Sequence, residues 1–306
     1  MSSSKISFIS ALLISMNIMI GAGIYISPPD MAFAAGDLSY LGWFAAFLLF
    51  LPVVLSLSKL AAYYPGEGGM YRYIKDTLGV FPGFLGAWVY FLGFVGAQSL
   101  QSLALRELVG YHIGSEFLIE NPWVFNLSFL AVLFFLCRYP MKNIAKIQSA
   151  VTLLKLFPLF FVIGLLVVLP GLGGGEILET VDEVARMPEA GSFAEALALV
   201  WKTIPYAIFG YWGFEACTNI SHRISGSKKN ASRVILLSFL VVCTLYTLFH
   251  FEVLRVMGSY GLYHQKVENF LGYAGWTSAL ALKVGFLIFS ACLSISYFNV
   301  VLSELL

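Results

Sequence analysis

Long apolar runs separated by short polar turns fill most of the chain. A helix that crosses a bilayer needs about 20 mostly apolar residues, because its backbone N–H and C=O groups must be satisfied internally. The pattern predicts about eight spans, near residues 8–34, 39–63, 81–110, 122–139, 144–170, 194–221, 233–256 and 277–304. Residues 64–80, with glycines and a proline followed by a run of Tyr, Lys and Arg, predict a turn and a short interfacial helix.

The composition agrees with a membrane protein. Hydrophobic residues make up 59% of the chain and charged residues 11%, whereas a soluble domain has about 45–50% and about 25%. The net charge of +1 gives no general attraction for nucleic acid. The first apolar run is too long for a cleaved signal peptide, so we expect a retained span. The cysteines form no C-x-x-C pair and are expected to pack in apolar runs, without metal or cofactor: Cys137, Cys217, Cys243 and Cys292.

Basic residues indicate the orientation. With a cytoplasmic N-terminus, four lie outside, namely Arg106, Arg186, Arg255 and Lys266. Eleven then lie inside: Lys5, Lys59, Arg72, Lys75, Arg138, Lys142, Lys146, Arg223, Lys228, Lys229 and Arg233. Cytoplasmic loops carry the excess of Lys and Arg, so we expect the N-terminus inside. The same choice puts the acidic segment 171–192 outside, as a solvated loop with a short surface helix at 177–185.

Two spans contain paired glycines near their middle. The first has Gly21-Ala22-Gly23, and the sixth has Gly210 and Gly213 followed by Glu215. Each glycine weakens a helix by about 1 kcal/mol relative to alanine. Non-helical backbone in a membrane is tolerated only where it is buried in protein or lines a cavity. The pattern therefore predicts interrupted first and sixth helices, although paired glycines also serve as simple packing notches between helices.

Interrupted helices have a chemical use. The free N–H groups at a helix start favour anions, and the free carbonyls at a helix end favour cations. Two breaks that face each other can hold the carboxylate and the ammonium of an amino acid by backbone atoms alone. Interrupted segments at corresponding places in two halves indicate the binding site of a transporter.

Five motifs, in order along the whole chain, resemble those of the amino acid–polyamine–organocation permeases. They are Ile20-Gly21-Ala22-Gly23-Ile24, the run from Tyr64 to Tyr73, Phe84-Leu85-Gly86-Ala87-Trp88, the segment from Ala145 to Leu156, and the run from Phe209 to Glu215. The resemblance implies an all-α membrane fold, the five-plus-five inverted repeat shared with sodium-coupled leucine transporters. Residues 1–306 would then form one domain, with a first repeat at about 8–170 and a second at about 194–306.

The resemblance also implies a substrate site. Backbone N–H groups of the first break would bind the carboxylate, and carbonyls of both breaks would bind the ammonium. Phe209 would cover the substrate, and the third span would face its side chain. The residues carried over in this way are Met19, Gly21, Ala22, Gly23, Ile24, Gly96, Ala97, Gln101, Phe209, Trp212 and Gly213.

Two charged residues are candidates for coupling and gating. Lys155 lies about 11 residues from the nearer end of its span, about 16 Å of helix, which is too far for its side chain to reach the interface. The resemblance implies that this lysine takes the place of a bound sodium ion and can couple transport to protons. Glu215 is either a proton-linked switch or a structural carboxylate, and the sequence leaves both open.

The chain departs from the family pattern in two places. The acidic pair and the proline usual after the sixth span are absent from 221–231. The chain also stops at its eighth span, so it looks truncated, with a second repeat that lacks its last two helices.

We expect a secondary transporter of amino acids or related amines in the plasma membrane, the inner membrane of a bacterium. It would be sodium-independent, working by exchange or proton coupling through alternating access, and a homodimer is compatible with it. The alternative is a non-transporting permease remnant, or a membrane ligand-binding or scaffold protein. No catalytic constellation is visible in the sequence, so we expect no enzyme.

Overall fold

The computed structural model describes residues 5–21, 23–64, 68–113, 117, 120–136, 156, 159–160, 163–164, 187–215, 218, 221–226 and 228–265. This part is helical, and the strand pairing found in it is a single bridge between Ile6 and Ile224. The eighth expected span, most of the fifth with Lys155, the proposed surface helix at 177–185 and Ala22 lie outside the described residues.

The first expected span is two helices, α1 (Phe8–Met19) and α2 (Gly23–Ala35), bent by 45° relative to each other. The side-chain oxygen of Ser7 caps the start of α1 by accepting a 3.1 Å hydrogen bond from the Ser10 N–H. Helix α2 runs into the short 3-10 helix η1 (Gly36–Leu38). The interruption predicted at Gly21 to Gly23 is therefore confirmed.

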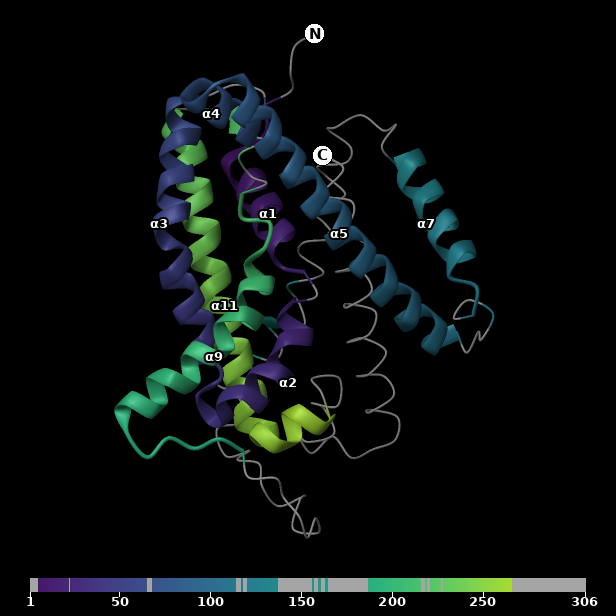
Figure 1. The fold of residues 1–306 in the computed structure, drawn as a ribbon, viewed down its shortest axis with the longest axis vertical. Helices are drawn as coiled ribbons and strands as arrows, with labels where there is room; N and C mark the ends of the chain where they lie inside the picture. Colours follow the sequence, from purple (N-terminus) through teal and green to yellow (C-terminus); the bar gives the residue numbers. More distant parts are fainter. Residues whose placement is uncertain are drawn as a thin grey trace.

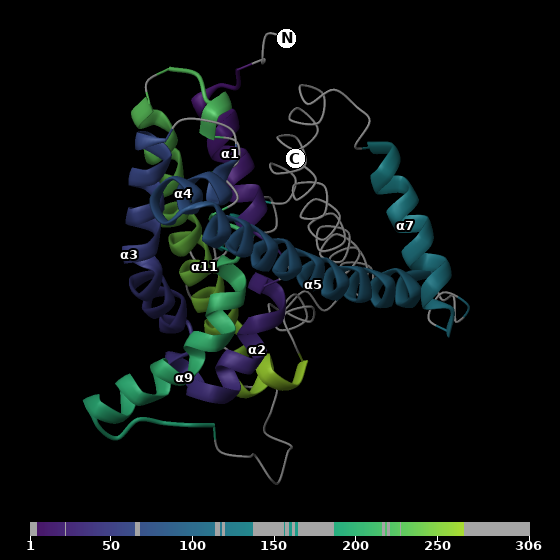
Figure 2. The ribbon, with the colours of Figure 1, turned by 45° about the horizontal axis from the view of Figure 1, so that its top comes forward.

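Helices α3 (Leu41–Tyr63) and α11 (Lys228–Gln265) lie side by side along the long axis of the molecule (Figures 1 and 2). Together with α1, α2 and α9 (Phe193–Tyr211) they enclose the core. Its largest fully buried side chains are aromatic: Trp43, Tyr211, Phe239, Tyr246 and Phe249. Helix α11 is longer than the expected span, and it kinks at Gly258, where φ is +69°.

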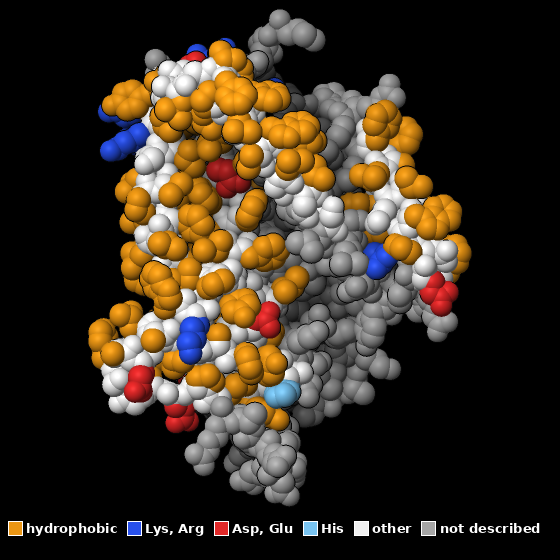
Figure 3. Space-filling model, viewed as in Figure 1, with side chains coloured by type: hydrophobic (Ala, Val, Ile, Leu, Met, Phe, Trp, Pro, Cys, Tyr) orange, Lys and Arg blue, Asp and Glu red, His pale blue; other side chains and the backbone are white. Residues whose placement is uncertain are grey.

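Helix α4 (Gly69–Leu78) is the short helix predicted between the second and third spans. It packs on α5 (Val80–Ile113), whose Gly83 and Gly86 let Lys75 and Ile74 approach closely. Helix α5 leaves the bundle toward α7 (Pro122–Leu136), as Figures 1 and 2 show. Apolar side chains cover much of the visible surface (Figure 3), as expected for helices that face lipid.

In the described part, α3 and the segment Lys229–His264 of α11 are long and apolar enough to cross a membrane, and the bent pair of α1 with α2 makes a third candidate. Val80–Gly93 and Pro122–Ala131 are shorter apolar helices. These helices identify an integral membrane protein. The count of eight spans and the inverted repeat stay predictions.

A backbone tether joins the residues before α1 to those after the sixth span. The Ile6 N–H donates to the Arg223 carbonyl, and the Ser225 N–H donates to the Ile6 carbonyl, both at 2.9 Å. This segment, 221–226, is the one that departs from the family pattern. The two hydrogen bonds fix it to the start of the chain.

Candidate functional site

The first break is a tight turn of main chain. The Ile20 N–H still donates to the Met16 carbonyl at 2.8 Å, but the Gly21 N–H donates to Met19, only two residues back, at 2.8 Å. Helix α2 then starts at Gly23. The side chains of Met19 and Ile24 are buried in the core, so only their backbone groups are candidates for contact with a ligand.

The second break follows Tyr211, the last residue of α9. Trp212 leaves the helix with ψ of 134°, and Gly213 has φ of +105°, a value that favours glycine. Gly210, which the sequence also assigned to this break, instead lies inside α9. A carboxylate closes the turn, because the Gly213 N–H donates to Oε2 of Glu215 at 3.2 Å.

The two breaks touch each other through glycine. A Cβ on Gly23 would lie 2.6 Å from the Cα of Gly210, which is closer than side chains allow. A Cβ on Gly213 would lie 2.7 Å from Cγ2 of Ile18 and 3.1 Å from its carbonyl oxygen. The start of α2 and the end of α9 therefore meet backbone to backbone, and the glycines permit this approach.

Tyr246 of α11 contacts both breaks. Its hydroxyl donates a 2.9 Å hydrogen bond to the Met19 carbonyl, and an added Cβ on Gly210 would lie 3.3 Å from its ring. The Met19 carbonyl also accepts from the Gly21 N–H. A carbonyl oxygen has two lone pairs, so both are engaged, and Met19 is less suited to the ammonium than the sequence suggested.

Trp43 of α3 supports the second break. Its ring lies edge-on to Tyr246, with centroids 4.8 Å apart, and faces the position that a Cβ on Gly210 would occupy. Its carbonyl accepts a 3.0 Å hydrogen bond from the hydroxyl of Tyr211. Helices α3 and α11 thus hold the ends of α1 and α9 through buried aromatic side chains.

Fully buried His250 completes this cluster. The Trp43 indole N–H donates to Nδ1 of His250 at 3.0 Å, and Nε2 lies 3.2 Å from the Ser39 hydroxyl. Because Trp can only donate, Nδ1 is the acceptor, and a neutral imidazole then carries its proton on Nε2. Sequence reasoning missed these residues. The available signal was the pair Tyr246 and His250, two polar side chains four residues apart in an apolar helix.

Two aromatic side chains at the end of α9 remain partly open. Phe209 is 39% exposed and Trp212 is 47% exposed. The Trp212 ring approaches α5, where an added Cβ on Gly93 would lie 3.5 Å from it. One turn later, a Cβ on Gly96 would meet no atom of the described part of the chain within 4 Å. The side chains of Ala97 and Gln101 lie outside the described residues.

Glu215 sits at the junction of the second break with α5. Besides accepting from Gly213, its carboxylate interacts with Tyr90 of α5. Its main-chain carbonyl accepts from both the N–H and the hydroxyl of Thr218, at 2.9 and 2.6 Å. These contacts suit a structural carboxylate, and they also place an ionisable group between two helices.

The structure thus brings together Met19, Gly21, Gly23, Ile24, Phe209, Trp212, Gly213 and Glu215, with Gly96 on the neighbouring helix. The profile of a family described as amino acid permease matches residues 6–305. The chain belongs to the amino acid permease family. This places it in the amino acid–polyamine–organocation superfamily and makes it a member of a family of transporters, not of enzymes.

Curated relatives of this permease-family chain are distant. The uncharacterised amino acid permease YtnA of Bacillus subtilis is 24% identical over 225 residues, 73% of this chain and 47% of the relative. The L-lysine transport protein of Corynebacterium glutamicum is 28% identical over 231 residues, 74% and 44% of the two chains. The serine/threonine exchanger SteT of Bacillus subtilis is 24% identical over 266 residues, 83% and 56%. The chain spans about half the length of the relatives it matches.

Proposed function

We propose that this protein carries amino acids or related amines across a membrane. It would bind the carboxylate and ammonium groups of an amino acid between its two helix breaks. The observation that supports the proposal is the main-chain contact of Gly23 with Gly210. It puts the start of α2, whose first N–H groups have no partner within the helix, beside the end of α9. There the Phe209 carbonyl accepts one hydrogen bond, from the Trp212 N–H at 3.3 Å, and keeps a second lone pair. Relatives are named as transporters of lysine and as exchangers of serine and threonine.

The carboxylate would bind at the start of α2. The first N–H groups of a helix have no partner within it, and the helix dipole puts about half a positive charge there. Gly23 and Ile24 supply these groups, together with Ala22 before them. The buried side chains of Met19 and Ile24 leave this part of the site to main-chain atoms, which suits any α-amino acid.

The ammonium would bind at the end of α9. Because both lone pairs of the Met19 carbonyl are engaged, the carbonyls of Phe209 and Trp212 are the better partners. The partly open rings of Phe209 and Trp212, with Gly96 of α5 beside them, would then face the substrate side chain.

We infer further how the protein is oriented in the membrane and how transport is driven. The N-terminus lies in the cytoplasm, the membrane is a bacterial inner membrane, and the two repeats move against each other by alternating access. Lys155 replaces sodium, and Lys155 with Glu215 couples flux to protons or permits exchange.

Uptake into proteoliposomes tests the proposal, with a panel of labelled neutral, acidic and cationic amino acids and polyamines. The wild type is compared with Gly23→Ala, where the added Cβ meets Gly210 backbone, and with Gly164→Ala, where it meets no atom of the described residues within 4 Å. We expect flux in the wild type and in Gly164→Ala and its loss in Gly23→Ala. Absence of flux for every substrate, with binding retained, would favour the ligand-binding alternative and reject the transport proposal.

A further inference from the structure

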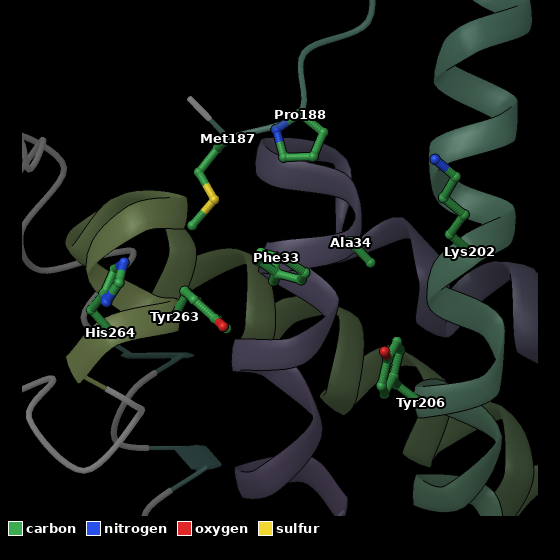
Figure 4. A pocket seen from close by; sticks show the side chains of 8 residues that line it. All are labelled: Phe33, Ala34, Met187, Pro188, Lys202, Tyr206, Tyr263 and His264. Carbon is green, nitrogen blue, oxygen red and sulfur yellow. The ribbon is translucent and has the colours of Figure 1, made fainter. Parts of the chain in front are cut away.

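A hollow lies away from the two breaks, at the end of the bundle opposite α4. Its volume is about 490 Å³, and it opens where the end of α2, the loop before α9, the middle of α9 and the end of α11 meet (Figure 4). Pockets that bind small molecules measure about 300–1,000 Å³. The space is therefore large enough for an amino acid.

One wall of the pocket is aromatic. The rings of Phe33 and Tyr263 stack with centroids 4.7 Å apart, and the His264 ring lies 4.9 Å from that of Tyr263. The Pro188 carbonyl packs directly on Gly36, which has φ of +56° and no room for a side chain. Specific contacts between elements distant in the sequence thus hold the aromatic wall and the loop before α9 in place.

The opposite wall carries a cation. Lys202 projects from α9 toward the end of α2, facing the side where Met187, Phe33 and Tyr263 gather (Figure 4). No carboxylate among the described residues forms an ion pair with it. The exposed carboxylate of Asp30 lies one helical turn before Phe33 on α2. A lysine is a compact positive charge with three donors, a natural partner for a carboxylate.

One face of α9 leads from the pocket toward the second break. Lys202, Tyr206 and Phe209 are spaced by four and three residues, so they share one face of the helix. Seven residues of helix cover about 10 Å. The Ser27 hydroxyl of α2 holds this face in place by donating to the Tyr206 carbonyl at 3.1 Å. Along this face Tyr206 and then Phe209 lie between Lys202 and the second break.

We propose that this pocket is a second binding site, which receives the carboxylate of an amino acid before it reaches the breaks, with Lys202 as the anion partner. Lys202 then selects ligands that carry a carboxylate and disfavours amines that carry only positive charge. The assignment of the amino acid as ligand rests on the proposed transport function. The recognition of a carboxylate with an apolar flank rests on the pocket itself.

Fluorine NMR of the purified full chain in a neutral detergent tests the pocket without transport. The probe is para-fluorophenylacetate, which has no ammonium for the site between the breaks, and its neutral partner is para-fluorophenylacetamide. We expect the acid to bind the wild type and Lys202→Arg, and to bind Lys202→Met about tenfold more weakly. Lys59→Met, which removes an exposed lysine of α3, should match the wild type. Equal binding of acid and amide, or unchanged binding of the acid to Lys202→Met, would reject the proposal that Lys202 binds a carboxylate in this pocket.

Two further measurements distinguish an amino acid from a lipid as the ligand of the pocket, and the pocket proposal from the transport proposal. Phenylalanine should displace the probe. If only a short-chain phosphatidylglycerol displaces it, the pocket takes a lipid phosphate and the amino acid assignment falls. In proteoliposomes, Lys202→Met should lower the uptake of neutral amino acids relative to that of polyamines. A wild type without any uptake but with Lys202-dependent binding of the acid would reject the transport proposal and keep the pocket.

Discussion

The hydroxyl of Tyr246, in the middle of α11, donates a 2.9 Å hydrogen bond to the main-chain carbonyl of Met19, the last residue of α1. The same ring borders Gly210, one residue before the end of α9. One side chain therefore fixes the spacing between the two interrupted helices. The proposed substrate site would depend on this spacing, because the first N–H groups of α2 and the last carbonyls of α9 would have to reach the same ligand.

Tyr246→Phe should weaken ligand binding while the protein stays folded. It removes one hydrogen bond, about 1 kcal/mol, and leaves the ring packing against Trp43. We expect a Kd about fivefold higher for a transported amino acid, measured by isothermal titration or by competition with a labelled ligand. Tyr63→Phe, a change at an exposed tyrosine of α3, is the matched control. A Kd equal to that of the wild type would mean that the Met19 carbonyl does not need this bond.

His250→Phe should destabilise the bundle. The change leaves the buried indole N–H of Trp43 and the Ser39 hydroxyl without their partner. An unsatisfied buried donor costs about 1–3 kcal/mol. We expect a lower Tm in detergent, with part of the loss recovered in His250→Gln, whose amide can both accept and donate. If His250→Phe melts at the wild-type temperature, the hydrogen bonds of His250 add nothing to stability.

Ile6→Pro should loosen the tether between the start of the chain and residues 221–226. Proline has no N–H, so the 2.9 Å hydrogen bond to the Arg223 carbonyl is lost. A loss of about 1 kcal/mol raises the open population about fivefold. Limited trypsin digestion in proteoliposomes should therefore cut after Arg223 faster. Ile6→Ala keeps both backbone hydrogen bonds and should be cut at close to the wild-type rate, and equal rates for all three proteins would contradict the role of the tether.

Lys155→Ala should remove the pH dependence of uptake. Lys155 is the residue that the family resemblance assigns to coupling, and an ionisable group in the middle of a span is costly unless it has a task. Uptake of a neutral amino acid is measured with and without an imposed pH gradient. Lys59→Ala serves as the control, since Lys59 is exposed near the end of α3. Unchanged flux with an unchanged pH profile would refute the assignment.

The interruption at Gly21 to Gly23 could be predicted from the sequence because its cause is local. Two glycines in an apolar run weaken the helix wherever it packs, and the structure breaks it there. Gly210 shows the limit of this reasoning. As a glycine, it should weaken a helix as much as Gly213 does. It nevertheless stays helical and provides the surface on which Gly23 packs.

The contacts of Trp43, Tyr246 and His250 that support the site could not be predicted from the sequence, for a different reason. The hydrogen bond from Tyr246 to Met19 joins residues 227 positions apart, and that from Trp43 to His250 joins residues 207 apart. Apolar spans with little amphipathic pattern do not reveal which of their faces meet. The same holds for Met19, whose carbonyl looked free for an ammonium until its two donors were known.

The second break contacts α5 through side chains, whereas the end of α9 contacts α2 through main chain. The Trp212 ring lies over Gly93, and Tyr90 reaches Glu215, so side chains alone make this junction. Gly23 and Gly210, in contrast, interlock through main chain that no rotamer change can release. The start of α2 and the end of α9 should therefore move together as one unit during a transport cycle. A cross-link between positions 93 and 212 would instead fix α5 to the second break, where the described contacts are made by the side chains of Trp212, Tyr90 and Glu215.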